Sequence, residues 1–334
     1  MVLESRWFYI SRHAMGLGRL LCWRVLFPGA GANQTKGKRM KYKALMTMMC
    51  ATAAVAWGGQ PIRPVSNPVL VDSPEVGTSV HPLVIYQAHP DVLDTTAGKV
   101  PAGGDFQVYA VQLEYAFTTD LSLIAVKDGY IDFNPDETLS KEEGWADLSA
   151  GLKYVFLREE GLIASAKTVI ELPVGDDEVW QGNGDGAVDP AVAFVYQSGK
   201  WQVNGTIGGV IALNNERSSS IYDSWHVSYE AAPGFFPLIE LNHMRVVDEG
   251  DGGARFDVQA DGGVPSIAKF EGGDLINFGA SNAKDNEDFV SLALGARYRI
   301  SEAIDVGGAY EFPLTDEEAS LMDYRVTLDL VWHL

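Results

Sequence analysis

The chain has 334 residues, 46% of them hydrophobic, with 45 acidic against 25 basic side chains. Nine basic residues and one acid lie in residues 1–43, so the rest of the chain carries 16 basic and 44 acidic side chains. A body this acidic repels nucleic acid and anionic lipid surfaces, which excludes a nucleic-acid-binding function.

The front of the chain predicts export. Residues 41–43 are a short basic start, residues 44–56 are an apolar run, and residues 54–56 form a small-residue cleavage motif. These three features together predict a signal peptide over residues 40–56. The apolar run is too short to cross a bilayer as a helix, so we expect the segment to be removed rather than to anchor the chain.

Residues 1–39 precede this signal as a basic extension. We interpret them as a mis-assigned N-terminal extension, with translation starting at Met40, and an unusually long basic start of the signal is the alternative. Both cysteines, Cys22 and Cys50, precede Trp57, the expected first residue of the mature chain. The mature chain would then contain no thiol, which agrees with export into an oxidising compartment.

Residues 57–104 form a Pro-rich N-terminal segment. Within it, residues 80–87 alternate apolar and polar side chains as a strand would. The segment could plug the interior of a barrel, add a strand, or lie in the periplasm, and the sequence leaves all three open.

Residues 105–334 repeat one pattern, in which blocks of about 9–13 residues alternate apolar with polar or small side chains. The final block has one fully apolar face, made by Met322, Tyr324, Val326, Leu328, Leu330, Trp332 and Leu334. A period of two over such a length indicates a strand. We predict twelve strands, at about 105–117, 121–131, 145–157, 161–172, 189–197, 200–213, 223–231, 235–246, 274–282, 289–300, 304–313 and 321–334.

Short turns alternate with long loops rich in Gly and Asp over most of this region, as in outer-membrane barrels. Two further strands, at 80–87 and 254–260, would raise the number to fourteen and keep both termini in the periplasm. Twelve strands is the prediction and fourteen is the alternative.

Strand length and aromatic placement favour a membrane barrel over a soluble β-sandwich. Soluble strands average about five or six residues, whereas a tilted membrane strand needs roughly 9–11. Aromatic side chains gather near block ends, where interfacial girdles lie: Tyr115, Phe117, Tyr154, Phe156, Trp225, Tyr229, Tyr310, Phe312, Tyr324 and Trp332. Lipid cannot pair a free strand edge, so the sheet must close. The predicted fold is all-β, a closed antiparallel up-and-down transmembrane β-barrel in the outer membrane.

Charged residues on the polar faces of these blocks are predicted to point into the lumen. The candidates for a pore lining are Glu114, Lys153, Lys167, Glu171, Glu230, Glu240, Arg297, Arg299, Asp323, Arg325 and Asp329. They could give a conducting pore its selectivity, or they could pair with one another and fill a barrel of intermediate size. The sequence leaves both open.

One pair of residues suggests catalysis. His226 and Ser228 share the polar face of one strand, as a histidine and the serine that it activates would. No third group that would orient the histidine can be assigned, so we expect no catalytic site and no enzyme activity.

Two acidic loops suggest a cation site. Their oxygen-bearing residues are Asn183, Asp185 and Asp189 in the first loop and Asp248, Glu249 and Asp251 in the second. These could bind Ca²⁺, but neither loop has the spacing of a known calcium loop, and solvated acidic loops are the simpler interpretation. We expect no metal and no cofactor.

Four short motifs occur in a recognisable order: Glu-Leu-Pro-Val-Gly-Asp at 171–176, Glu-Leu-Asn at 240–242, Gly-x-Arg-Tyr at 295–298 and Asp-Leu-Val-Trp-His-Leu at 329–334. In this order and spacing they resemble the outer-membrane transporter family of the meta-pathway of phenol degradation. The resemblance spans most of residues 105–334 and implies passage of small, often aromatic or apolar, compounds. Such barrels usually end on an aromatic residue that the insertion machinery reads, whereas this chain ends on Leu334.

We therefore predict a passive outer-membrane channel for small, aromatic or apolar solutes, without chemical turnover. Its expected partners are outer-membrane lipid, the barrel-insertion machinery through the last strand, and a small-molecule solute. The alternatives are a structural or adhesive surface barrel that binds through its acidic loops, and an outer-membrane lipid hydrolase.

Overall fold

A computed structural model describes residues 59–254, residue 256 and residues 263–334. The predictions for residues 1–39 and for the signal peptide lie outside the described residues, as does most of the suggested strand at 254–260. Among the residues that are described, no helix has the length and apolar character needed to cross a membrane.

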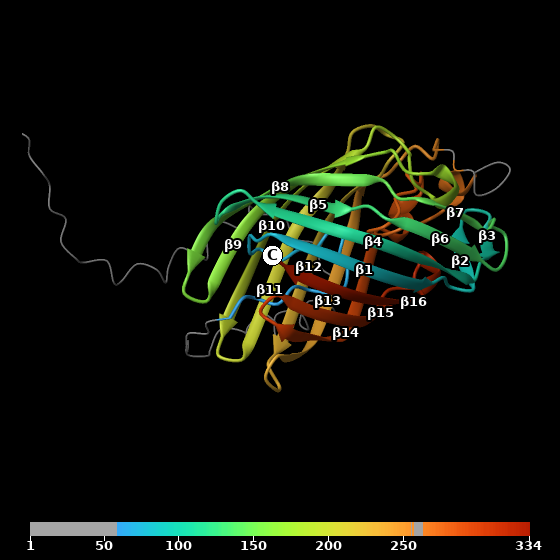
Figure 1. Ribbon diagram of the computed structural model, residues 1–334. Helices are drawn as coiled ribbons and strands as arrows, with labels where there is room; N and C mark the ends of the chain where they lie inside the picture. The colour runs from blue at the N-terminus through green and yellow to red at the C-terminus, as the bar shows by residue number, and fades with distance from the viewer. Residues whose placement is uncertain (1–58, 255, 257–262) are drawn as a thin grey trace, which may run out of the picture. The chain divides into compact units, whose positions relative to one another are not determined.

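The described residues are built almost entirely from strands (Figure 1). The main sheet contains β1 Ser79–Ala88, β4 Gly104–Ala116, β5 Leu121–Lys127, β6 Tyr130–Pro135, β7 Glu142–Trp145, β8 Leu148–Glu159, β9 Leu162–Leu172, β10 Ala187–Ser198, β11 Trp201–Ala212, β12 Ser219–Tyr229, β13 Phe235–Asp248, β14 Asp288–Ser301, β15 Ile304–Pro313 and β16 Tyr324–His333. Strands β2 Val92–Thr95 and β3 Gly98–Pro101 form a separate hairpin.

The main sheet closes on itself. Strand β1 pairs with β16 on one side and with β4 on the other, both antiparallel. Strands β5 and β6 lie end to end beside β4, and β7 and β8 lie end to end beside them. Each of these two pairs fills one position in the ring, so twelve antiparallel positions surround the lumen in the described part of the chain. The prediction of a closed twelve-stranded barrel is confirmed.

Side chains alternate across the wall as the sequence predicted. On β16, Arg325 and Thr327 are buried, at 2% and 1% exposed, whereas Leu328 and Trp332 on the outer face are 57% and 50% exposed. A strand places successive side chains on opposite faces, and the outer face of a barrel in lipid must be apolar. The barrel is an outer-membrane barrel with a polar interior.

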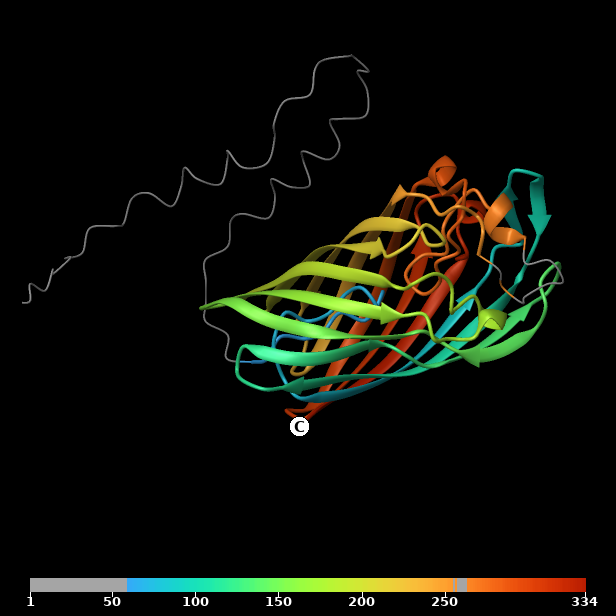
Figure 2. The ribbon, with the colours of Figure 1, turned by 90° about the horizontal axis from the view of Figure 1, so that it is seen from above.

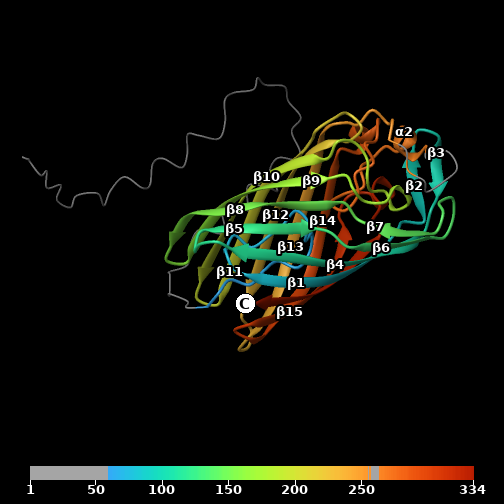
Figure 3. The same cartoon turned by 45° about the horizontal axis from the view of Figure 1, so that its top comes forward.

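The two ends of the barrel differ. Tight turns join β4 to β5, β8 to β9, β10 to β11, β12 to β13 and β14 to β15, and the chain ends at the same rim, where Ser79 pairs with His333. The opposite rim carries the long connections, with hairpin β2–β3, helix α2 Val264–Ile267 and the 3-10 turns η1 Asp177–Val179, η2 Ala283–Asn286 and η3 Glu317–Ala319 (Figure 3). In outer-membrane barrels the short turns face the periplasm.

The number of strands was right, but two assignments were not. Residues 274–282 form no strand; Leu275, Ile276 and Phe278 are buried in a core at the long-loop rim. They are apolar because they pack inside the protein, which periodicity alone does not distinguish from facing lipid. Their place in the ring is taken by β1, which covers the suggested strand at 80–87.

The long β13–β14 connection, residues 249–287, returns into the barrel mouth and is called the mouth loop below. Its described residues Phe256, Phe270 and Phe278 pack against Phe106 and Phe133 of the barrel wall in one buried cluster. The inner faces of β4 and β6 near the long-loop rim are therefore apolar, and the mouth loop shares their buried cluster.

Residues 59–78, called the plug below, enter the lumen from the short-turn rim before β1 begins. Figure 2 shows this first described segment, in blue, inside the ring of strands. Inward side chains of β4, β8, β9, β11, β13 and β14 all bond to it. The plug and the mouth loop together occupy the interior.

Candidate functional site

The plug is a hairpin-like loop with three parts. Residues 60–66 form an entry leg, residues 67–71 a tip, and residues 72–78 a return leg that leads into β1. At the tip, the Val71 N–H donates to the Asn67 carbonyl at 3.0 Å, and Asn67 adopts a positive φ of 52°. Asparagine is among the side chains that tolerate this conformation best, so the reversal suits the sequence.

Three barrel side chains hold the entry leg. Gln202 of β11 accepts the N–H of Ile62 at 2.9 Å and donates to the carbonyl of the same residue at 2.7 Å. Glu240 of β13 accepts the N–H groups of Val65 and Ser66 at 2.9 and 2.7 Å. Arg297 of β14 donates to the carbonyls of residues 63 and 64 at 2.9 and 3.4 Å. The leg is held mainly through its backbone.

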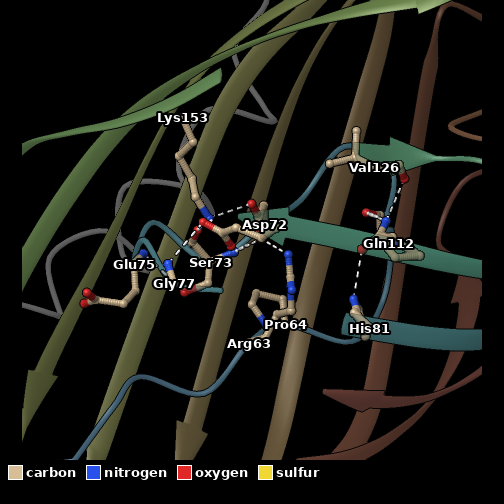
Figure 4. A network of polar contacts seen from close by, with 12 residues as sticks. Arg63, Pro64, Asp72, Ser73, Glu75, Gly77, His81, Gln112, Val126 and Lys153 are labelled. Atoms are coloured by element: carbon tan, nitrogen blue, oxygen red, sulfur yellow. Dashed lines mark hydrogen bonds and ion pairs between the residues drawn. The ribbon is translucent and has the colours of Figure 1, made fainter. Parts of the chain in front are cut away.

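The return leg is fixed by a buried charge cluster centred on Lys153 of β8 (Figure 4). The Lys153 ammonium lies 2.9 Å from Asp72, 2.9 Å from the Ser73 carbonyl and 3.0 Å from Glu114 of β4. Arg63 of the entry leg also pairs with Asp72, which ties the two legs together. Burial alone would raise the pKa of Asp72, but Arg63 and Lys153 outweigh burial and lower that pKa below its ordinary value.

A second cluster lies under the seam where the ring closes. His81 of β1 lies 2.8 Å from Asp329 of β16, and Arg297 of β14 donates to the same carboxylate at 2.6 Å. The other ring nitrogen of His81 lies 2.9 Å from Gln112, which also donates to the Pro68 carbonyl at the plug tip (Figure 4). One network therefore joins the seam to the plug.

A third cluster lies higher in the lumen, between the strands and the loop after β11. Glu171 of β9 accepts from Lys127 of β5 at 2.9 Å and from Arg217 at 2.7 Å. Arg217 also lies 3.4 Å from Asp147. Burial alone would lower the pKa of Arg217, but Glu171 and Asp147 raise it. Buried charges are tolerated when they are paired in this way.

One acid of the mouth loop binds the barrel wall, and another holds the loop together. Asp274 accepts two bonds from Arg325 of β16, at 2.7 and 3.1 Å. Glu271 is buried and accepts the N–H groups of Gly272, Phe278 and Ala280. Burial raises the pKa of Glu271, although these N–H bonds oppose the shift.

Little space is left between the plug tip and the mouth loop. Two cavities at this level measure about 30 and 20 Å³, and both are lined by Val69 of the tip and Leu275 of the mouth loop. Each has room for one or two water molecules. At the short-turn rim a larger hollow of about 350 Å³ opens beside residues 59–61. The structure is a closed state of the barrel.

The structure places the predicted lining residues in three groups. Those that contact the plug are Glu114, Lys153, Lys167, Glu240, Arg297 and Arg299. Glu171, Arg325 and Asp329 bond to other lumen groups. Glu230 and Asp323 are corrections, because Glu230 follows the end of β12 in a tight turn and Asp323 precedes the start of β16.

Several residues of the site were missed by the sequence analysis. They are Arg63, Asp72, His81, Gln112, Lys127, Gln202, Arg217, Glu271 and Asp274. Gln112, Lys127 and Gln202 face inward on strands, and strand phase could have identified them. The others on the plug and in the loops carry no periodic signal.

The pair His226 and Ser228 does have a third group. His226 Nδ1 lies 2.7 Å from Glu240 and its Nε2 lies 3.0 Å from the Ser228 hydroxyl. All three side chains are buried at the inner wall, and both oxygens of Glu240 also accept N–H groups of the plug. The arrangement therefore serves the plug, and no lipid can reach the serine in this closed state.

At least three of the six residues of the suggested cation loops bond to other groups of the chain. Asn183 donates to two carbonyls, Asp189 accepts from Tyr222 at 2.7 Å, and Glu249 accepts the Lys284 N–H at 2.8 Å. In the part of the chain that is described, no group of three or more His, Cys, Asp or Glu side chains could hold a metal ion.

Comparison with known proteins agrees with this architecture. Residues 87–253, half of the chain, match the family model "Putative MetA-pathway of phenol degradation". The chain belongs to this family. No curated protein sequence matches the chain.

One solved structure shares the fold, and a second is reported beside it. An outer membrane channel from Pseudomonas putida F1 superimposes with a TM-score of 0.55 at 16% identity, covering 82% of this chain and 100% of that chain. The NanC porin gives a TM-score of 0.44 at 7% identity, covering 77% of this chain and 100% of that chain. The family and the fold place the chain in the outer membrane.

Proposed function

We propose that the chain is a passive outer-membrane channel for small solutes, closed in this structure by its plug, and that it carries out no chemical turnover. One observation carries the proposal. The interior is occupied by the chain's own plug and mouth loop, which bond to the barrel wall and pack with it. Such segments can move without breaking the ring of strands.

The lining suggests which solutes would pass. The short-turn half is lined by paired charges such as Lys153 with Glu114 and Arg297 with Asp329. Near the long-loop rim, β4 and β6 present Phe106, Val108, Ile131 and Phe133, in the same half as the charge pair of Glu171 with Arg217. A small aromatic or apolar compound with a polar group would find partners in both halves, as the family description also suggests. The nine predicted charges on strands would line its path.

Solute uptake into liposomes tests this proposal. We compare the native protein with the double variant Val65→Pro/Ser66→Pro, which lacks the two N–H groups that Glu240 accepts. The matched control is Val65→Ala/Ser66→Ala, which keeps both N–H groups. We expect the proline variant to admit small solutes faster than the native and alanine forms. Equal and negligible uptake by all three would remove the channel while leaving the fold.

The alternatives have less support. An adhesive role through residues 248–270 would rest on exposed acids such as Asp248 and Asp251, whereas Ala254, Phe256 and Phe270 of the same segment are buried. Lipid hydrolysis would need access to Ser228, which is 2% exposed. We also propose that the barrel-insertion machinery recognises strand β16.

A further inference from the structure

The barrel recognises the plug mostly through main-chain atoms. Side chains of the wall bond to the backbone at residues 60, 62, 63, 64, 65, 66, 68, 70, 73 and 77. Plug side chains receive fewer wall contacts, from Asn242 to Ser66, Lys153 to Asp72 and Arg158 to Glu75. Two side chains of the entry leg, Ile62 and Val65, are also buried, at 1% and 0% exposed, so recognition combines main-chain bonds with apolar side chains at these positions.

The entry leg shows the clearest pattern. The carboxamide of Gln202 pairs with both the N–H and the carbonyl of Ile62, as a neighbouring strand would. Arg297 then takes two successive carbonyls, and Glu240 takes the next two N–H groups. Three inward side chains from β11, β13 and β14 thus bond to the main chain of each residue from 62 to 66.

Proline in the leg fits this scheme. Pro61 and Pro64 have no N–H group to satisfy and favour an extended backbone. The leg therefore presents carbonyls at residues 60, 63 and 64, where the wall offers the cations Arg299 and Arg297. A hollow of about 350 Å³ opens at the short-turn rim beside residues 59–61, where the leg begins.

We propose that Gln202, Glu240 and Arg297 form a binding groove for short, extended, proline-containing peptides, which the entry leg occupies as a tethered ligand. When the leg leaves, the groove takes a free peptide of the same class. This goes beyond the channel proposal, because the groove binds its ligand whether or not the barrel conducts.

In the full chain, the double substitution Val65→Pro/Ser66→Pro removes the two N–H groups that Glu240 accepts, so the entry leg should leave the groove. A single cysteine at position 62, introduced by Ile62→Cys, reports on the leg, because Ile62 is 1% exposed in the closed state. In the mature chain, which begins after both native cysteines, this thiol should react quickly with a water-soluble reagent only in the proline variant. Protection of the thiol in that variant would show that Glu240 does not hold the leg and would overturn the proposal.

Peptide binding is then measured by fluorescence anisotropy with a labelled peptide of residues 59–67. We expect saturable binding to the proline variant and at least roughly tenfold weaker binding to the native protein, whose groove is occupied. Replacing Ile62 and Val65 of the peptide by alanine should also weaken binding, by roughly tenfold or more, because both side chains are buried and Val65 packs with Leu238, Ala293 and Ala309. Methylating its nitrogens at positions 65 and 66 should weaken binding by roughly tenfold or more, because Glu240 then lacks its donors.

The barrel side of the groove is tested by Gln202→Ala in the same background, with Thr327→Val on β16 as a matched lumen control. Absence of binding to a variant whose introduced thiol at position 62 reacts, or equal binding of the methylated peptide, would overturn the groove. Solute uptake measured on the same preparations separates the two proposals. Peptide binding without uptake removes only the channel, and uptake without peptide binding removes only the groove.

Discussion

Replacing Lys153 by Met removes the charge that joins the wall to the return leg, while the apolar stem remains. The Lys153 ammonium and its two acidic partners are buried, with side chains 1%, 5% and 6% exposed. Removing one member of a buried ion pair typically costs about 3–5 kcal/mol. Asp72 keeps Arg63, and Glu114 keeps the Ser122 hydroxyl at 2.7 Å. We therefore expect the lower end, about 3 kcal/mol of unfolding free energy.

The matched control lies on the same strand. Arg158 of β8 also pairs with the return leg, through Glu75, but its side chain is 40% exposed. Exposed pairs contribute about 0–1 kcal/mol, so Arg158→Met should change stability little. Denaturant unfolding of the refolded protein, followed by tryptophan fluorescence, measures both variants. If the two variants lost the same amount within about 1 kcal/mol, the buried cluster would not hold the plug as described.

Three further predictions concern the long-loop end. Burial lowers the pKa of His89 to about 4 in the folded chain, whereas the unfolded chain has a His pKa of about 6.5. Between these two pH values His89 is protonated in the unfolded chain and neutral in the folded chain. The contribution of His89 to the free energy of unfolding should be complete above pH 6.5 and fall by about 3 kcal/mol towards pH 4. If a His89→Phe variant lost the same free energy of unfolding over this pH range, His89 would not be the cause. Phe278→Ala should cost about 3–5 kcal/mol and leave an apolar cavity that binds a small aromatic compound such as phenol, seen as a calorimetric signal absent from the native protein. A Cβ at Gly279 would overlap the main-chain oxygen of Glu216, whereas one at Gly273 meets nothing within 4 Å, and both glycines have positive φ. Gly279→Ala should therefore expose the mouth loop to protease much more than Gly273→Ala, and equal cleavage would contradict the packing of this loop.

The alternation of side chains predicted the barrel because it reports directly on the two faces of a strand. The same pattern predicted a strand wrongly at 274–282, because Leu275 and Phe278 are apolar in order to pack in the core at the barrel mouth and do not face lipid. Strand β1 was predicted only as an alternative strand. Pro82 cannot donate to the β-ladder, although β1 pairs with a neighbour on both sides. The break between β5 and β6 was not predicted either, because there the Asp128 carboxylate accepts the Val111 N–H in place of a ladder bond.

The candidate site was predictable only in part, for a related reason. Strand phase places Lys153 and Glu240 in the lumen, but it cannot say what they meet there. Their partners Asp72, Val65 and Ser66 lie on an irregular segment, whose path is set by contacts distant in sequence. The filled lumen was therefore one of two open possibilities until the position of the plug was known.

Single-molecule conductance across a planar lipid bilayer tests closure by the plug most directly. The native protein should stay near the baseline, and Val65→Pro/Ser66→Pro should give steady, larger open steps, because its entry leg no longer bonds to Glu240. A native protein that conducts steadily at the level of the proline variant would contradict the account, since residues 60–66 would then not close the lumen.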